Sequence, residues 1–183
     1  FPQVRLPENF EKDLAKGTQG NPLFLNEILR KMVLDQKIYL SGQQWVIMPL
    51  EEGYLPRSLE EMVKKKIADL DEESRQLLYQ AATFGEDVPL SLLTGSSEKN
   101  EAKVLESVDQ AVAQGLLRSD FQINDEAIRF LGKRILETIY ETIEPNQKQE
   151  LHGRIGNYQE VLYHQHLLPS PVTLVYHFQR SAN

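Results

Sequence analysis

The stretch GTQGNPLFLNEIL, residues 17–29, carries the strongest local signals in this chain. Gly17 and Gly20 supply backbone freedom, and Asn21 can cap the start of a helix. Pro22 suits the first helical position, where a missing N–H costs nothing. Apolar residues then recur over a broad helical face. These residues alone predict a well-started helix that packs into a core.

The composition is that of a globular chain. Its 183 residues suffice for one ordinary domain or two small ones, and 40% of them are hydrophobic. The absence of cysteine excludes disulfides, thiolate metal sites and thiol nucleophiles, and it fits a reducing compartment, so we expect a cytoplasmic protein. No apolar run approaches the roughly 20 residues of a membrane span. The net charge of −7 disfavours unaided binding to polyanions.

Hydrophobic periodicity and turn signals predict a mainly α fold. The expected helices are residues 8–16, 22–36, a helix beginning at Ser58, 72–83, 88–93, 98–114, 133–142, 145–164 and 172–180. Short β-like runs at 37–40 and 44–48 predict a hairpin, and runs at 116–119 and 127–131 predict two strands around a polar tip. The turn-rich segment 51–56 is the first plausible boundary.

The phrase Gly-Asn-Pro-Leu-Phe-Leu-x-Glu-Ile-Leu at 20–29 resembles the Gly-x-Pro segment of the STAND-class nucleoside triphosphatases. These are the signal-transduction branch of the AAA+ ATPases. In that family the segment lies in the helical lid behind the nucleotide-binding core, and its proline lies against the bound adenine nucleotide. The resemblance implies that Gly20 and Pro22 contact an adenine nucleotide, together with a core upstream of this chain.

Further phrases resemble the winged-helix domain that follows the lid in large bacterial regulators of this class. They are Leu-Pro-x-Ser-Leu at 55–59, Leu-x-x-Ala-Ala-x-x-Gly at 78–85 and Gly-Leu-Leu at 115–117. Residues 130–140 resemble the family phrase Phe-x-His-x-x-x-Arg-Glu-x-x-Tyr. In this chain Gly132 stands at the position of the His and Leu136 at the position of the Arg. Tyr-His-Phe at 176–178 is similar to the start of the helical repeats that usually follow.

The resemblance therefore implies three parts in a mainly α chain. Residues 1–52 would be the C-terminal part of an AAA+ helical lid with a small hairpin. Residues 56–131 would be a winged helix, a helix-turn-helix with a small β-wing. Residues 132–183 would be C-terminal helices that lead into a helical-repeat region.

The chain lacks the residues of nucleotide hydrolysis. The phosphate-binding pattern G-x-x-x-x-G-K-S/T is absent, and no apolar strand ends in an Asp that could hold Mg²⁺. We therefore expect no catalysis and no cofactor in this chain by itself, with ATP or ADP and Mg²⁺ bound in a parent protein. The chain begins with Phe1 rather than Met, so we expect it to be cut from a longer protein or processed.

Metal and hydrolase sites are disfavoured. His164 and His166 would lie about 200° apart on a helix and cannot share a face. His152, on the polar face of its helix, and His177 are interpreted as ordinary surface or core histidines. Residues 95–97, Gly-Ser-Ser, do not match the G-x-S-x-G pattern of a nucleophile elbow.

DNA binding is disfavoured by charge. The helix expected at 98–114, in the recognition position, carries Lys99 and Lys103 against four acidic residues. Because phosphate contacts need Lys or Arg, we expect no DNA binding by this face.

The sequence thus predicts a non-catalytic part of a signalling ATPase that relays nucleotide state through lid and winged-helix packing. Its partners would be its own upstream nucleotide-binding core and downstream repeat region, with room for an oligomer in the parent protein and no membrane contact. The alternative is a stand-alone winged-helix adaptor or transcription regulator that binds protein or DNA. What precedes Phe1 would separate the two interpretations.

Overall fold

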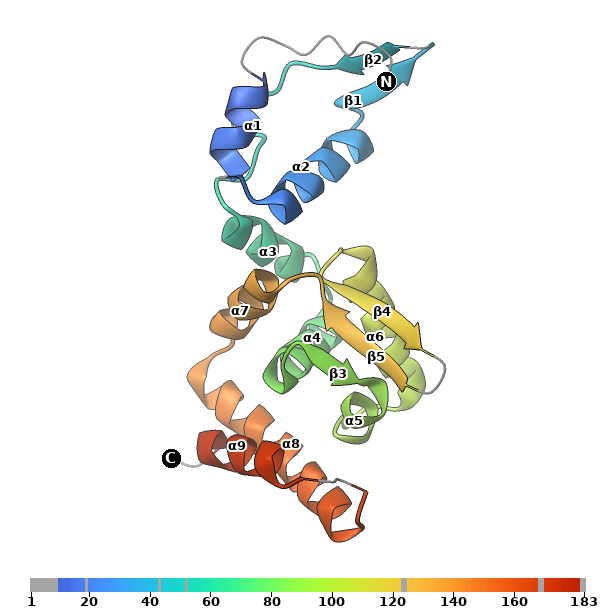
Figure 1. Ribbon diagram of the computed structural model, residues 1–183, viewed down its shortest axis with the longest axis vertical. Helices are drawn as coiled ribbons and strands as arrows, with labels where there is room; N and C mark the ends of the chain where they lie inside the picture. The colour runs from blue at the N-terminus through green and yellow to red at the C-terminus, as the bar shows by residue number, and fades with distance from the viewer. Residues whose placement is uncertain are drawn as a thin grey trace. The chain divides into compact units, whose positions relative to one another are not determined.

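The computed structural model describes residues 10–18, 20–42, 44–51, 53–122, 125–167 and 170–181, with the backbone alone at 120–122 and 125. Residues 8 and 9, the first two of the helix expected at 8–16, lie outside this part. The described part is mainly helical, as predicted (Figure 1). The chain divides into two compact units, residues 1–62 and 63–183. The three-part division expected from the sequence stays a prediction.

The first unit is a pair of helices followed by a hairpin. It contains α1 (Phe10–Thr18), α2 (Pro22–Leu34), β1 (Ile38–Ser41) and β2 (Gln44–Ile47). Both helices contribute buried apolar side chains, which are Phe10, Leu14, Phe24, Ile28 and Met32. The predicted hairpin is confirmed, since Ile38 pairs with Ile47 and Leu40 with Trp45.

Two predicted helix ends in this unit are wrong. The first helix continues to Thr18, past the expected end at residue 16, and the Thr18 hydroxyl donates to the Leu14 carbonyl at 2.8 Å. The second helix ends at Leu34 rather than residue 36, because Gln36 adopts a left-handed φ of 54° that no α-helix accommodates.

The next helix, α3 (Leu59–Ala68), begins where the sequence predicts. Ser58 Oγ accepts a hydrogen bond from the Glu61 N–H at 3.1 Å, and the Glu61 carboxylate accepts one from the Arg57 N–H at 2.8 Å. These bonds satisfy N–H groups that a helix start leaves without partners.

Among the described residues, the first part of the second unit contains helices and three short strands. After α3 it contains α4 (Glu72–Phe84), β3 (Asp87–Pro89), α5 (Leu90–Gly95), α6 (Glu101–Ala113), β4 (Leu117–Gln122) and β5 (Asp125–Phe130). The strands form an antiparallel sheet in the order β3-β5-β4, as Figure 1 shows. Buried side chains from α4, among them Leu77, Leu78 and Ala81, contribute to its core.

Two helix starts in this unit correct the sequence prediction. The segment 88–93 is not one helix, because Val88 is fully buried and pairs with Ile128, and the helix begins only at Leu90. The next helix starts at Glu101 rather than residue 98, because Asn100 Oδ1 accepts the Lys103 N–H at 3.0 Å and caps the helix there.

Three helices complete the chain: α7 (Lys133–Thr142), α8 (Pro145–His164) and α9 (Val172–Ser181). The first two have the predicted bounds. Figure 1 shows α9 in red alongside α8. Gly156 allows this approach, since a Cβ there would lie 3.1 Å from the Phe178 ring.

Some apolar side chains of the helices are exposed, among them Leu105, Val161 and Val175. Within the described ranges, no helix combines the length and the apolar character that crossing a membrane requires.

Candidate functional site

The predicted site residues Gly20 and Pro22 lie at the turn between α1 and α2. Gly20 has a φ of +73°, and a Cβ there would meet no atom within 4 Å, so backbone conformation rather than crowding favours glycine. Asn21 Oδ1 accepts the N–H groups of Leu23 at 3.0 Å and Phe24 at 3.3 Å. The predicted cap, with Pro22 at the helix start, is therefore confirmed.

An open groove of about 460 Å³ follows this turn, between α1 and α2. Pro22, Leu25 and Leu29 recur at helical spacing along one side of it. Phe24, Ile28 and Met32 form a separate, buried stripe of the same helix. The helix is thus apolar on two faces, one in the core and one lining the groove. From α1 and the turn, the lining residues are Phe10, Glu11, Leu14, Ala15, Thr18 and Gly20.

The groove is nearly free of charge. Among its lining residues Glu11 alone has an ionisable side chain, and the Thr18 hydroxyl is engaged by the Leu14 carbonyl. Apolar walls with few polar groups suit a flat, uncharged ring better than a phosphate group. The residues present could therefore hold a nucleobase, whereas the phosphates and metal of a nucleotide would need other ligands.

Lys99, which lies just before α6, and Lys103, which lies on α6, both contact groups of their own unit. Lys103 Nζ lies 3.4 Å from the Glu106 carboxylate and 3.7 Å from that of Glu73. The charge of Glu106, followed by Glu73, raises the pKa of Lys103 above its usual value. Lys99 Nζ donates to the Glu73 carbonyl at 2.9 Å. Phosphate would compete with these contacts for both lysines.

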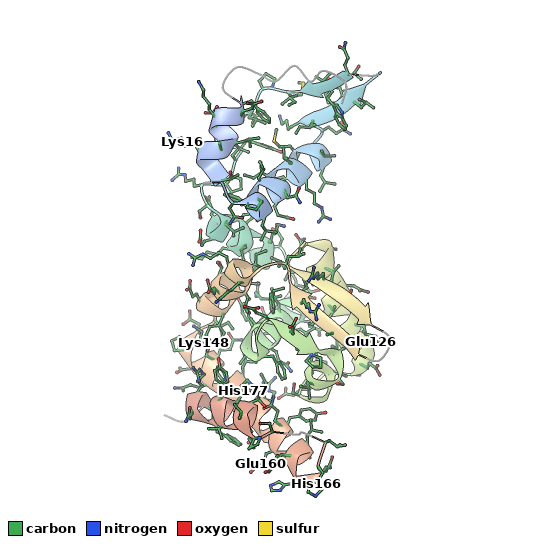
Figure 2. The ribbon with its side chains drawn as sticks, viewed as in Figure 1. Lys16, Glu126, Lys148, Glu160, His166 and His177 are labelled. Atoms are coloured by element: carbon green, nitrogen blue, oxygen red, sulfur yellow. The ribbon has the colours of Figure 1, made fainter. Side chains whose placement is uncertain are left out.

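Two histidines occupy a place that the sequence does not reveal. His152 is 1% exposed, which corrects its assignment to a polar helix face, and His177 is 2% exposed. Their Nδ1 atoms are 2.9 Å apart, and Tyr140 Oη lies 2.9 Å from His152 Nε2 (Figure 2 labels His177). Three helices, α7, α8 and α9, thus contribute to one buried cluster.

A weak sequence signal for this cluster exists. The buried positions of α8 recur at helical spacing and include His152 beside Leu151, with Ile155, Gly156 and Gln159 following. His164 ends α8, and His166 lies beyond it with a φ of 59°. Over the ranges that the structure describes, no three His, Cys, Asp or Glu side chains gather as metal ligands.

Comparison with models of known protein families gives no match to this chain. Comparison with curated proteins gives no match either. The family expectation therefore rests on the residues of the chain itself.

Proposed function

We propose that this chain is a non-catalytic relay of a STAND-class signalling ATPase, and that the groove at Gly20 and Pro22 contacts the adenine of a bound nucleotide. One observation carries the proposal. The two residues that the Gly-x-Pro resemblance assigns to adenine line the same apolar groove. Adenine is flat and uncharged, so its burial against Leu25 and Leu29 would be favourable.

In this proposal the chemistry belongs to a nucleotide-binding core upstream in the same cytoplasmic protein. That core would bind the phosphates and Mg²⁺ of ATP or ADP, since this chain carries no phosphate-binding pattern. The chain would report which nucleotide is bound, because a lid that contacts the base shifts with the nucleotide state.

The downstream part would carry this movement onwards as a rigid body. Residues 56–131 would form a winged helix, and residues 132–183 would lead into helical repeats. The order α4, β3, α5, α6, β4, β5 supports this assignment, as does the small antiparallel sheet in the order β3-β5-β4. A densely packed core favours movement as one body.

The test is Pro22→Ala in the full-length protein that carries this chain. Loss of the Pro22 ring removes part of the groove wall, so we expect ADP affinity to fall about tenfold, which equals about 1.4 kcal/mol. Isothermal titration measures the affinity, and an ATPase assay measures turnover. The matched control is Pro145→Ala, which changes the same helical position of α8 in the other unit. Unchanged ADP affinity and ATPase rate in Pro22→Ala would contradict the proposal.

The alternative, a stand-alone winged-helix regulator, is favoured by the same order of helices and strands. A gel-shift titration with generic duplex at low salt separates the two. We expect no shift, because Lys99 and Lys103 contact groups of Glu73 and Glu106. Clear binding at micromolar protein, together with a native protein near 21.1 kDa on an immunoblot, would favour the regulator.

A further inference from the structure

The cluster of Tyr140, His152 and His177 is a continuous hydrogen-bonded chain across three helices. Tyr140 Oη contacts His152 Nε2, and His152 Nδ1 contacts His177 Nδ1, both at 2.9 Å. The Phe84 ring of α4 packs edge-on against His177 with centroids 6.0 Å apart. Water is thus largely excluded from both imidazoles.

The Nδ1–Nδ1 contact limits the protons that the pair can hold. With both rings neutral, one Nδ1–H donates to the other Nδ1, and Tyr140 completes the chain as donor or acceptor. A single added proton is tolerated, with His177 donating to His152 and His152 donating to Tyr140. A second added proton would place two N–H groups and two positive charges against each other, so the contact would have to break.

We infer that Tyr140, His152 and His177 form a proton-sensitive latch, which holds α9 against α8 at neutral pH and releases α9 when both histidines are protonated. This inference is independent of the proposed function. Release would expose the apolar face of α9, which includes Leu174. It would also expose α8 at Gly156, which the Phe178 ring covers.

The surrounding charges favour release in acid. From α9, Arg180 lies over the Tyr176 ring, with its guanidinium carbon 3.8 Å from the ring centroid, and its charge disfavours protonation of both histidines. From α8, Lys148 Nζ lies 4.8 Å from the Tyr140 ring centroid. The neighbour from α4, Phe84, is uncharged.

Burial lowers the pKa of His152 to about 4, and Arg180 contributes to the shift. Burial likewise lowers the pKa of His177 to about 4, with charge repulsion from His152 and Arg180. With α9 released, His152 on α8 and His177 on α9 would both have the ordinary pKa of about 6.5. The state with α9 released therefore binds more protons between pH 6.5 and 4, so docking of α9 is strongest above pH 6.5 and weakens as the pH falls. At pH 5 each histidine would weaken docking by about 30-fold.

The first experiment follows the four histidines of the unaltered chain by NMR as the pH is lowered. We expect the signals of His152 and His177 to show uptake of a second proton only when α9 is released. Protonation of both His152 and His177 near pH 6.5 in a chain whose α9 stays protected would overturn the latch.

The second experiment measures amide hydrogen exchange in α9, corrected for intrinsic rates, at pH 7.5 and pH 5. Protection of α9 should fall by orders of magnitude more than that of α6. The variant His177→Asn keeps polar atoms near the Nδ1 position but cannot titrate here, so the acid-induced loss should shrink by about 30-fold. His164→Asn is the matched control and should behave as the unaltered chain. An equal response of α6 and α9 in the unaltered chain would overturn the inference, and this comparison holds even if His177→Asn folds poorly.

Discussion

Gly95 illustrates what a single residue controls in this protein. It ends α5, and a Cβ there would overlap Oη and Cζ of Tyr158 on α8 and lie 2.9 Å from Cε1. We predict that Gly95→Ala lowers the free energy of unfolding by about 2 kcal/mol, because the Tyr158 ring must leave its place. Urea denaturation followed by circular dichroism measures the loss.

Two variants make this residue-scale prediction specific. In a Tyr158→Ala background the cost of Gly95→Ala should nearly vanish, since nothing remains for the new methyl group to displace. Gly153→Ala is the matched control, because its Cβ would lie 3.5 Å from Ser181 Cβ, an ordinary contact. It should be neutral or stabilise by up to about 1 kcal/mol through helix propensity. The prediction would be contradicted if Gly95→Ala lowered the free energy of unfolding as much in the Tyr158→Ala background as in the unaltered chain.

At the scale of one element, the start of α2 depends on its cap. Asn21 Oδ1 accepts two N–H groups of the first helical turn. We predict that Asn21→Ala destabilises the first unit by about 1 kcal/mol, the usual cost of losing such a cap. Fluorescence of Trp45, the one tryptophan in the chain, reports unfolding of this unit in urea.

Asn26→Ala provides the control, since it removes the same side chain from an exposed position inside α2. It should leave stability unchanged or raise it slightly, because alanine has the higher helix propensity. Equal destabilisation by the two variants would show that capping does not determine where this helix begins.

At the scale of the whole molecule, the two compact units should unfold separately. The first, residues 1–62, buries fewer apolar side chains than residues 63–183, so we predict that it unfolds at lower urea. Trp45 fluorescence reports the first unit, and the NMR signals of His152 and His177 report the second.

Ile28→Ala should lower the fluorescence midpoint, because Ile28 is 2% exposed in the first unit, and leave the histidine signals unchanged. Coincident transitions in the unaltered chain, or a shift of both midpoints in Ile28→Ala, would mean that the units unfold as one.

Local chemistry explains which elements could be predicted. Asp71 caps α4 by accepting the Ser74 N–H at 2.7 Å, Pro145 opens α8, and Gly115 follows α6 with a φ of 67°. Each signal acts within about four residues, so it is readable along the chain. Val88 was misassigned to a helix because a short apolar run suits either structure until a partner strand is known.

The sequence by itself determined the mainly α fold, both ends of α7 and α8, the starts of α2, α3 and α4, and the turn and cap at Gly20, Asn21 and Pro22. It did not reveal that Pro22, Leu25 and Leu29 would line a groove, or that two histidines 25 residues apart would meet at 2.9 Å. The reason is physical. Caps and turns depend on bonds between near neighbours, whereas a groove or a buried pair depends on how separate helices pack. Only the tertiary structure decides that packing.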